Sequence, residues 1–142
     1  MKYNYIYSLL LLFLCFGFQA QAQRVVAYQT KLSELSSTQV SAWKIELEGD
    51  YDQKYINFRD LENAEQVFEE IEIIDLKWDG QSVLTLPTAA VNRLQSLRLI
   101  YLRSNQVLND NVIKQRFRQL IQQVERLDQD VEIVYRTMEK PN

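Results

Sequence analysis

The sequence has no histidine, and its only cysteine is Cys15. Histidine and cysteine are the usual zinc ligands, and histidine is the commonest general base, so their scarcity argues against a metal centre and against most catalytic chemistry. Glycine is scarce as well, with three residues in 142, and no glycine-rich run is present that would cradle a phosphate group. We therefore expect no enzyme activity, no metal and no cofactor.

The first 22 residues have the order of a secretory signal peptide. Lys2 supplies a positive charge, residues 7–18 form an apolar run, and Ala20-Gln21-Ala22 provides a small-x-small cleavage site. The apolar run is short for a membrane span and no stop-transfer charges follow it, so we expect no stable membrane insertion once the signal is removed. The protein is expected to be secreted or periplasmic.

Residues 23–142 are expected to form a single domain, with residues 136–142 as a frayed tail. Cleavage removes Cys15, so the domain has no disulfide to stabilise it. Loss of Lys2 takes the net charge from −3 to −4, and we expect no nucleic-acid partner. Residues 23–80 carry 13 acidic and 6 basic side chains, whereas the rest of the domain carries 6 acidic and 9 basic ones.

Two segments share a pattern of apolar positions that ends in an acid or an amide. Residues 71–79 fit Φ-x-x-Φ-x-Φ-x-x-D and residues 97–105 fit Φ-x-x-Φ-x-Φ-x-x-N, while a weaker copy ends at Asp50. In each copy apolar residues recur first at spacings of three and four and then at two, which predicts a short helix followed by a strand. The expected helix and strand pairs are residues 32–38 with 44–48, 61–70 with 73–77, and 88–96 with 99–103.

Residues 110–127 have the clearest helical pattern in the chain. Asp110 or Asn111 can cap this helix, and one apolar stripe runs from Val112 to Leu127. Residues 131–135 alternate between apolar and polar and predict a closing strand after the helix.

The second copy of the pattern extends backwards through a leucine-proline pair. Its residues resemble one unit of a leucine-rich repeat protein: Leu86, Pro87, Val91, Leu94, Leu97, Ile100, Leu102 and Asn105. The resemblance covers residues 31–106. It implies an α/β fold in which helix-strand units stack into one sheet of about four to five strands, with helices on one face and a C-terminal capping helix and strand. Another compact α/β arrangement is the alternative.

Stacked units would leave every second strand residue on an open face of the sheet, because side chains alternate along a strand. Two rows result, one of Glu46, Asp75, Tyr101 and Val134, the other of Glu48, Lys77, Arg103 and Arg136. Since aromatic residues and arginine dominate binding hot spots, this face is the candidate binding surface. Its candidate residues are Glu46, Glu48, Asp75, Lys77, Trp78, Tyr101 and Arg103. A solvated sheet face is the simpler interpretation, and for Trp78 buried packing is the alternative.

These features favour an exported, non-enzymatic interaction domain that binds a protein or a cell-envelope component through its sheet face. A structural envelope protein without a specific ligand is one alternative. A carboxylate-dependent hydrolase is another, because a glycosidase needs only two carboxylates and Glu69, Glu70 and Glu72 are clustered.

Overall fold

The structure is a computed structural model that describes residues 24–48, 54–127 and 129–139. The expected signal peptide and the expected repeat position Asp50 lie outside the described residues. Within the described ranges, no helix is both long and apolar enough to cross a membrane.

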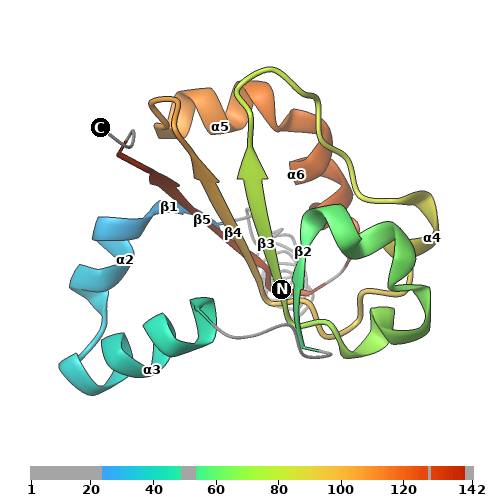
Figure 1. Cartoon of the computed structure of the whole chain (residues 1–142), viewed down its shortest axis with the longest axis horizontal. Coiled ribbons are helices and arrows are strands. Elements are labelled where there is room, and N and C mark those ends of the chain that lie inside the picture. Colours follow the sequence, from blue (N-terminus) through green and yellow to red (C-terminus); the bar gives the residue numbers. More distant parts are fainter. Residues whose placement is uncertain (1–23, 49–53, 128, 140–142) are drawn as a thin grey trace, which may run out of the picture.

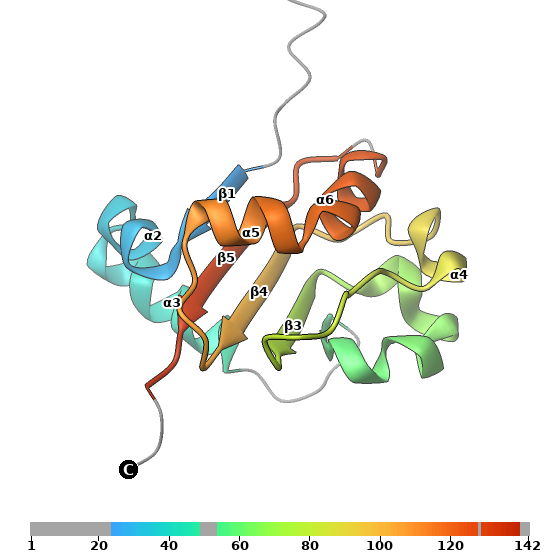
Figure 2. The ribbon, with the colours of Figure 1, turned by 90° about the horizontal axis from the view of Figure 1, so that it is seen from above.

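Five parallel strands form one sheet in the order β1-β5-β4-β3-β2. Figure 2 shows β1, β5, β4 and β3 side by side in this order. The strands are β1 (Arg24–Ala27), β2 (Tyr55–Asn57), β3 (Ile73–Trp78), β4 (Leu99–Ser104) and β5 (Glu132–Thr137). The α/β class is confirmed, as are strands near residues 73–77, 99–103 and 131–135. The last strand runs two residues into the segment expected to be a frayed tail.

Two of the helices expected from the sequence are divided into shorter segments. The segment expected as one helix over residues 61–70 is a pair of 3₁₀ helices, and the long C-terminal helix is divided at Phe117. The elements are α2 (Tyr28–Glu34), α3 (Ser37–Leu47), η1 (Phe58–Asn63), η2 (Glu65–Glu70), α4 (Thr88–Val91), α5 (Asp110–Arg116) and α6 (Arg118–Glu125).

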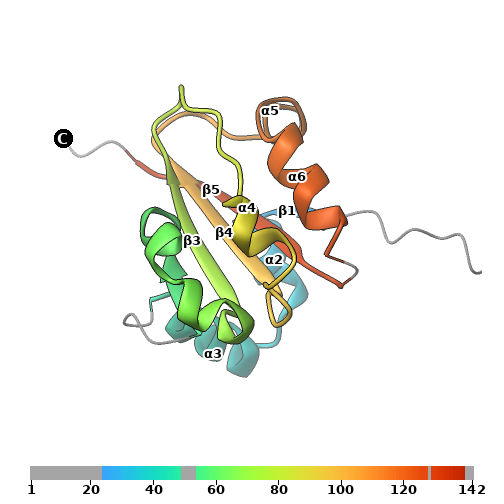
Figure 3. The same cartoon turned by 90° about the vertical axis from the view of Figure 1, so that its right-hand side faces the viewer.

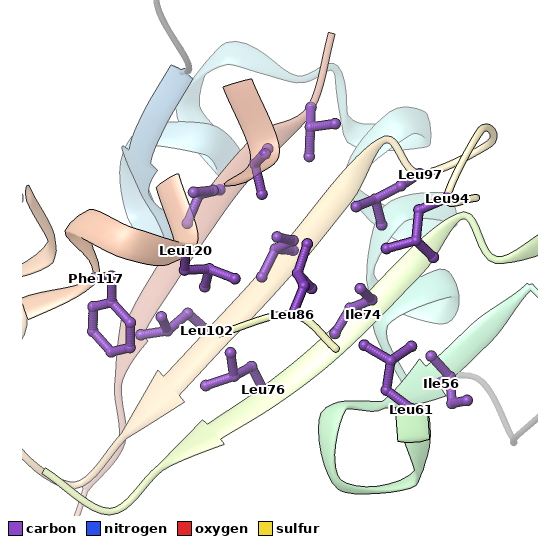
Figure 4. Close-up of a cluster of buried hydrophobic side chains, with 14 of the residues drawn as sticks. Ile56, Leu61, Ile74, Leu76, Leu86, Leu94, Leu97, Leu102, Phe117 and Leu120 are labelled. Atoms are coloured by element: carbon purple, nitrogen blue, oxygen red, sulfur yellow. The ribbon is translucent and has the colours of Figure 1, made fainter. Parts of the chain in front are cut away.

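The larger core lies between one face of the sheet and the helical segments that join β2, β3, β4 and β5 in turn. Ile74, Leu76, Ile100 and Leu102 point into it from β3 and β4. Figure 4 shows Ile74, Leu76 and Leu102 meeting apolar side chains from the connecting segments. The labelled partners there are Leu61, Leu86, Leu94, Leu97, Phe117 and Leu120.

A second core covers the opposite face, so the expectation of helices on one face only is wrong. Tyr28 of α2 and Trp43 of α3 are buried there against Leu99 and Tyr101 of β4. Figure 3 shows α3 on the side of the sheet away from α5 and α6. The reason is topological: β1 and β2 lie at opposite edges of the sheet, and α2 and α3 cross this face to connect them.

The strand expected over residues 44–48 is wrong, because this segment is the last part of α3. A reciprocal capping box starts the helix, with Gln39 N donating to the Ser36 hydroxyl and Ser36 N donating to the Gln39 side chain. Trp43 and Leu47, four residues apart, then face the sheet together, while Ile45 between them is 70% exposed. A strand that alternated at Ile45 and Leu47 would have buried both.

Replacing Trp43 by alanine tests whether α3 covers the second face. We expect the free energy of unfolding to fall by about 3–5 kcal/mol, because the change removes a buried indole and leaves a cavity. The measurement is denaturant unfolding followed by circular dichroism. Ile45→Ala on the same helix is the matched control and should change stability by less than about 0.5 kcal/mol. Equal effects of the two changes would contradict the placement of α3.

Candidate functional site

The second face of the sheet becomes polar where the strands approach their carboxyl ends. The strand register pairs Lys77 with Arg103 and Arg103 with Arg136, so one cation from each of β3, β4 and β5 stands in a line across the sheet. We call these three residues the basic row. Asp75, Tyr101 and Val134 form the preceding line on the same face. Both lines match the rows expected from the sequence for these strands.

Asp75 and Arg103 form a two-pronged ion pair that anchors the centre of the basic row. Arg103 Nε donates to Asp75 Oδ1 over 3.0 Å, and Arg103 Nη2 donates to Oδ2 over 2.6 Å. Asp75 is only 4% exposed, and a buried carboxylate is costly unless it is paired and hydrogen-bonded. The guanidinium therefore compensates the buried charge and is held in one orientation while part of it remains exposed.

Aromatic rings fix the other arginine of the row. The Arg136 guanidinium carbon lies 4.5 Å from the centre of the Tyr28 ring, and Arg103 lies 5.4 Å from the Tyr101 ring. A hydrogen bond with the Tyr101 hydroxyl raises the pKa of Arg136. Burial raises the pKa of Tyr101 itself, against the opposing effect of Arg136. Both arginines are thus positively charged and positioned by neighbouring rings.

Two hollows flank Arg103 at the carboxyl ends of the strands. One, of about 620 Å³, lies over the ends of β1, β4 and β5 and is lined by Tyr28, Tyr101 and Arg136 among others. The other, of about 730 Å³, lies over the ends of β2, β3 and β4 and includes Lys77. In open parallel sheets ligands bind at the carboxyl ends of the strands, where connections leave toward opposite faces. Here β1 leads to α2 on one face and β4 leads to α5 on the other, with β5 between the two strands.

Trp78 lines the hollow beside Lys77 but points away from the basic row, and its alternative interpretation as buried packing is the one observed. Its position in β3 faces the larger core, where it is 5% exposed and meets Phe117 edge to face at 4.9 Å between ring centres. Its indole N–H donates to the carbonyl of Ser82 over 2.9 Å. The register pairs Trp78 with Ser104, which lies three residues after Tyr101 on β4. Because side chains alternate along a strand, Trp78 and Tyr101 therefore point to opposite faces of the sheet.

Glu46 and Glu48 are also misplaced by the sequence analysis. Glu46 lies on α3, where its carboxylate accepts a hydrogen bond from Arg98 over 2.8 Å, and Glu48 is the residue that ends this helix. Neither can extend a row across the sheet. Asn57 of β2 occupies the register position beside Asp75 instead.

One of the three carboxylates considered for hydrolysis, that of Glu69, is engaged in an ion pair. Glu69 binds Arg93 over 2.7 Å, and this hydrogen bond lowers the pKa of Glu69. A general acid needs a raised pKa, so Glu69 is unsuited to that task. Among the described residues, no group of three acidic or cysteine side chains is arranged to hold a metal ion.

Comparison with protein-family models, curated proteins and solved structures finds no match. The site must therefore be judged on its own chemistry. The exposed members of its basic row are cations, which can bind carboxylates or phosphates, and the acids Asp79 and Glu139 also line the two hollows. The arginines remain protonated in proteins and cannot exchange a proton with a substrate.

Tyr28 is the residue of this site that the sequence analysis missed. It follows β1 directly and packs on Tyr101 with 6.0 Å between ring centres. The apolar run Val25-Val26-Ala27 is too short to predict a strand from the sequence alone. No local signal indicates that β1 pairs with β5, because the two strands are separated by almost the whole domain.

A double-mutant cycle of Asp75→Asn and Arg103→Gln tests the anchoring pair. We expect each single change to destabilise the protein, and the coupling energy to be about 1–3 kcal/mol, because each change leaves a partly buried partner without its ion pair. The free energies of unfolding come from urea denaturation. Additive effects would show that Asp75 does not hold Arg103.

Proposed function

We propose that this chain is an exported, non-enzymatic interaction domain that binds a protein or a cell-envelope component through the basic row. The main observation in support is the basic row itself. Three cations lie in register on one face, at the carboxyl ends of the strands, where parallel sheets commonly bind ligands. Arg103 is held by a buried carboxylate, and Arg136 is held over an aromatic ring. Such positioned groups lose little conformational freedom when a partner binds.

We also propose that β2 to β5 are degenerate leucine-rich-repeat-like units. These strands are neighbours in chain order, and their connecting segments contribute to one core. The apolar positions of the best-matching unit are buried in that core, including Leu86, Leu94 and Leu97. Asp79, at the place of the family's asparagine, accepts hydrogen bonds from the N–H groups of Gln81 and Ser82 in the turn after β3.

The proposed surface departs from a regular repeat protein in one respect. In a simple stack of helix-strand units the whole open face of the sheet is available for binding, whereas here α2 and α3 cover much of it. The interaction surface is consequently confined to the carboxyl ends of the strands.

Alanine replacement of Lys77 and Arg136 together tests the function. Both side chains are exposed, but Arg136 also contacts the Tyr28 ring and the Tyr101 hydroxyl. The domain should therefore lose no more than about 2 kcal/mol of stability while it loses capture of its partner from an envelope extract. Tyr101 and Arg103 are poorer targets, because one is buried and the other compensates a buried charge.

Lys114→Ala is the matched control for this experiment. Lys114 is an exposed lysine on α5, on the other side of the sheet, and no ion pair involves it within the described residues. Capture should be unchanged in this variant. Retention of the partner by the Lys77 and Arg136 double variant would contradict the proposed binding surface.

Export makes a separate prediction about the N-terminus. If residues 1–22 are removed after Ala22, the intact mass of protein recovered from outside the cytoplasm corresponds to a chain that begins at Gln23. Mass spectrometry of that fraction measures this directly. A chain that still begins at Met1 there would count against cleavage.

A further inference from the structure

Cations at the amino ends of the strands and cations at the carboxyl ends differ in how they are neutralised. At the amino ends of the strands, basic side chains are matched to nearby carboxylates. Lys31 and Arg24 contact Glu132 at 2.7 and 3.5 Å, and Arg98 contacts Glu46 at 2.8 Å. These cations are already satisfied within the protein.

At the carboxyl ends, the outer members of the basic row are not matched in this way. Neither Lys77 nor Arg136 has an ion pair within 4 Å among the described residues, and both side chains are exposed. Two carboxylates nearby offset part of this charge without forming an ion pair with Lys77 or Arg136. Asp79, whose hydrogen bonds within its own turn lower its pKa to about 2, lines the same hollow as Lys77, and Glu139 lines the same hollow as Arg136.

The positions of Lys77 and Arg136 determine how far apart two anionic groups must be to bind both side chains. Lys77 and Arg136 stand on β3 and β5, on either side of Arg103, whose charge is already used by Asp75. Neighbouring strands lie about 4.8 Å apart, so the backbones of Lys77 and Arg136, which are two strands apart, are separated by about 10 Å. This spacing suits two separate anionic groups better than one ion held by converging donors.

A long polyanion is a poor occupant of this row. The whole chain is acidic, with a net charge of −3, and η1 and η2 carry a dense set of acidic side chains that would repel a long polyanion. Tyr28 and Tyr101 are buried, so they present no open ring for a nucleobase to stack on. The acidic side chains are Asp60, Glu62, Glu65, Glu69 and Glu70.

An extended peptide segment has the required spacing. In polyproline II conformation a chain rises about 3.1 Å per residue with three residues per turn, so side chains three residues apart project on the same side about 9 Å apart. Two acidic residues separated by two others would therefore reach both cations. A short segment of this kind would meet η1 only at its first residues, where Phe58 and Arg59 line the hollow beside Lys77.

We infer that the basic row receives an extended acidic segment of a partner protein, with carboxylates three residues apart bound by Lys77 and Arg136. This inference rests on the proposed function and specifies the chemistry of the partner. Arg103 stays on Asp75 and separates the two contacts. The Tyr28 ring keeps Arg136 in place.

The test is a nuclear magnetic resonance titration of the domain with three synthetic peptides. One carries two glutamates three residues apart, the second carries them adjacent, and the third carries glutamines. We expect the first peptide to shift the side-chain signals of Lys77 and Arg136 and to bind at least about threefold more tightly than the second, since only it reaches both cations. Raising the salt concentration from about 0.05 to about 0.3 M should weaken this binding.

Variants identify the residues responsible. Lys77→Gln with Arg136→Gln should weaken binding of the first peptide at least about fivefold, while Lys114→Gln should leave it unchanged. Equal affinity for all three peptides would overturn the inference. So would equal shifts of the same signals by inorganic phosphate at the same concentration, because that result indicates a site for single anions.

The same peptides separate this inference from the proposed function. If alanine at Lys77 and Arg136 abolishes partner capture but the first peptide does not compete for the partner, the binding surface stands and the acidic-segment inference fails. If capture is unaffected by those substitutions, the binding surface itself is wrong.

Discussion

The crossing of α2 and α3 from β1 to β2 is the constraint on which the rest of this structure depends. A parallel sheet exposes backbone and apolar side chains on both faces and is stable only when both are covered. The segments between β2 and β5 cover one face, and only the crossing covers the other. Without Tyr28, Trp43 and Leu47, the apolar residues of β3 and β4 on that face would be in contact with water.

The same crossing limits which part of the second face is accessible. It covers the central part of the second face and leaves the carboxyl ends of β3, β4 and β5, where the side chains are charged. Hence the basic row sits beside an apolar core rather than on an open sheet. Burial next to the row makes the Asp75 carboxylate dependent on Arg103, which in turn gives this arginine a fixed direction.

Charged side chains are paired differently at the two ends of the strands. Ion pairs neutralise the cations at the amino ends of the strands, whereas Lys77 and Arg136 at the carboxyl ends have no ion pair within 4 Å among the described residues. The Lys31–Glu132 pair is largely shielded from water, with side chains 17% and 18% exposed, whereas the Arg98–Glu46 pair is exposed and contributes little to stability. The cations of the sheet that lack an ion pair therefore stand at the carboxyl ends of the strands, despite a net negative chain.

Local patterns were sufficient for the central strands. The apolar runs at residues 73–77 and 99–103 predict β3 and β4 because strands buried on both faces contain few polar residues. The row of Lys77 and Arg103 follows from the same pattern, since equivalent positions of aligned copies share a register. The capping box at Ser36 and Gln39 was also readable, and it would have identified α3 as a helix.

Contacts between segments distant in the chain could not be predicted from the sequence. The alternation at Ile45 and Leu47 suits a strand as well as a helix, and only the contact of Trp43 and Leu47 with the sheet resolves the choice. Likewise, Trp78 lies in the sequence beside residues expected to bind a partner. The strand register places it on the opposite face of the sheet, where it packs against Phe117.

The sequence by itself determined the α/β class, the three central strands and the identity of the cations in the basic row. Only the tertiary structure decided that β1 pairs with β5, that helices cover both faces, and that Asp75 is buried against Arg103. The physical reason is the range of the interactions. Periodicity and capping act within a few residues, whereas burial of a sheet face depends on segments that are distant in the chain.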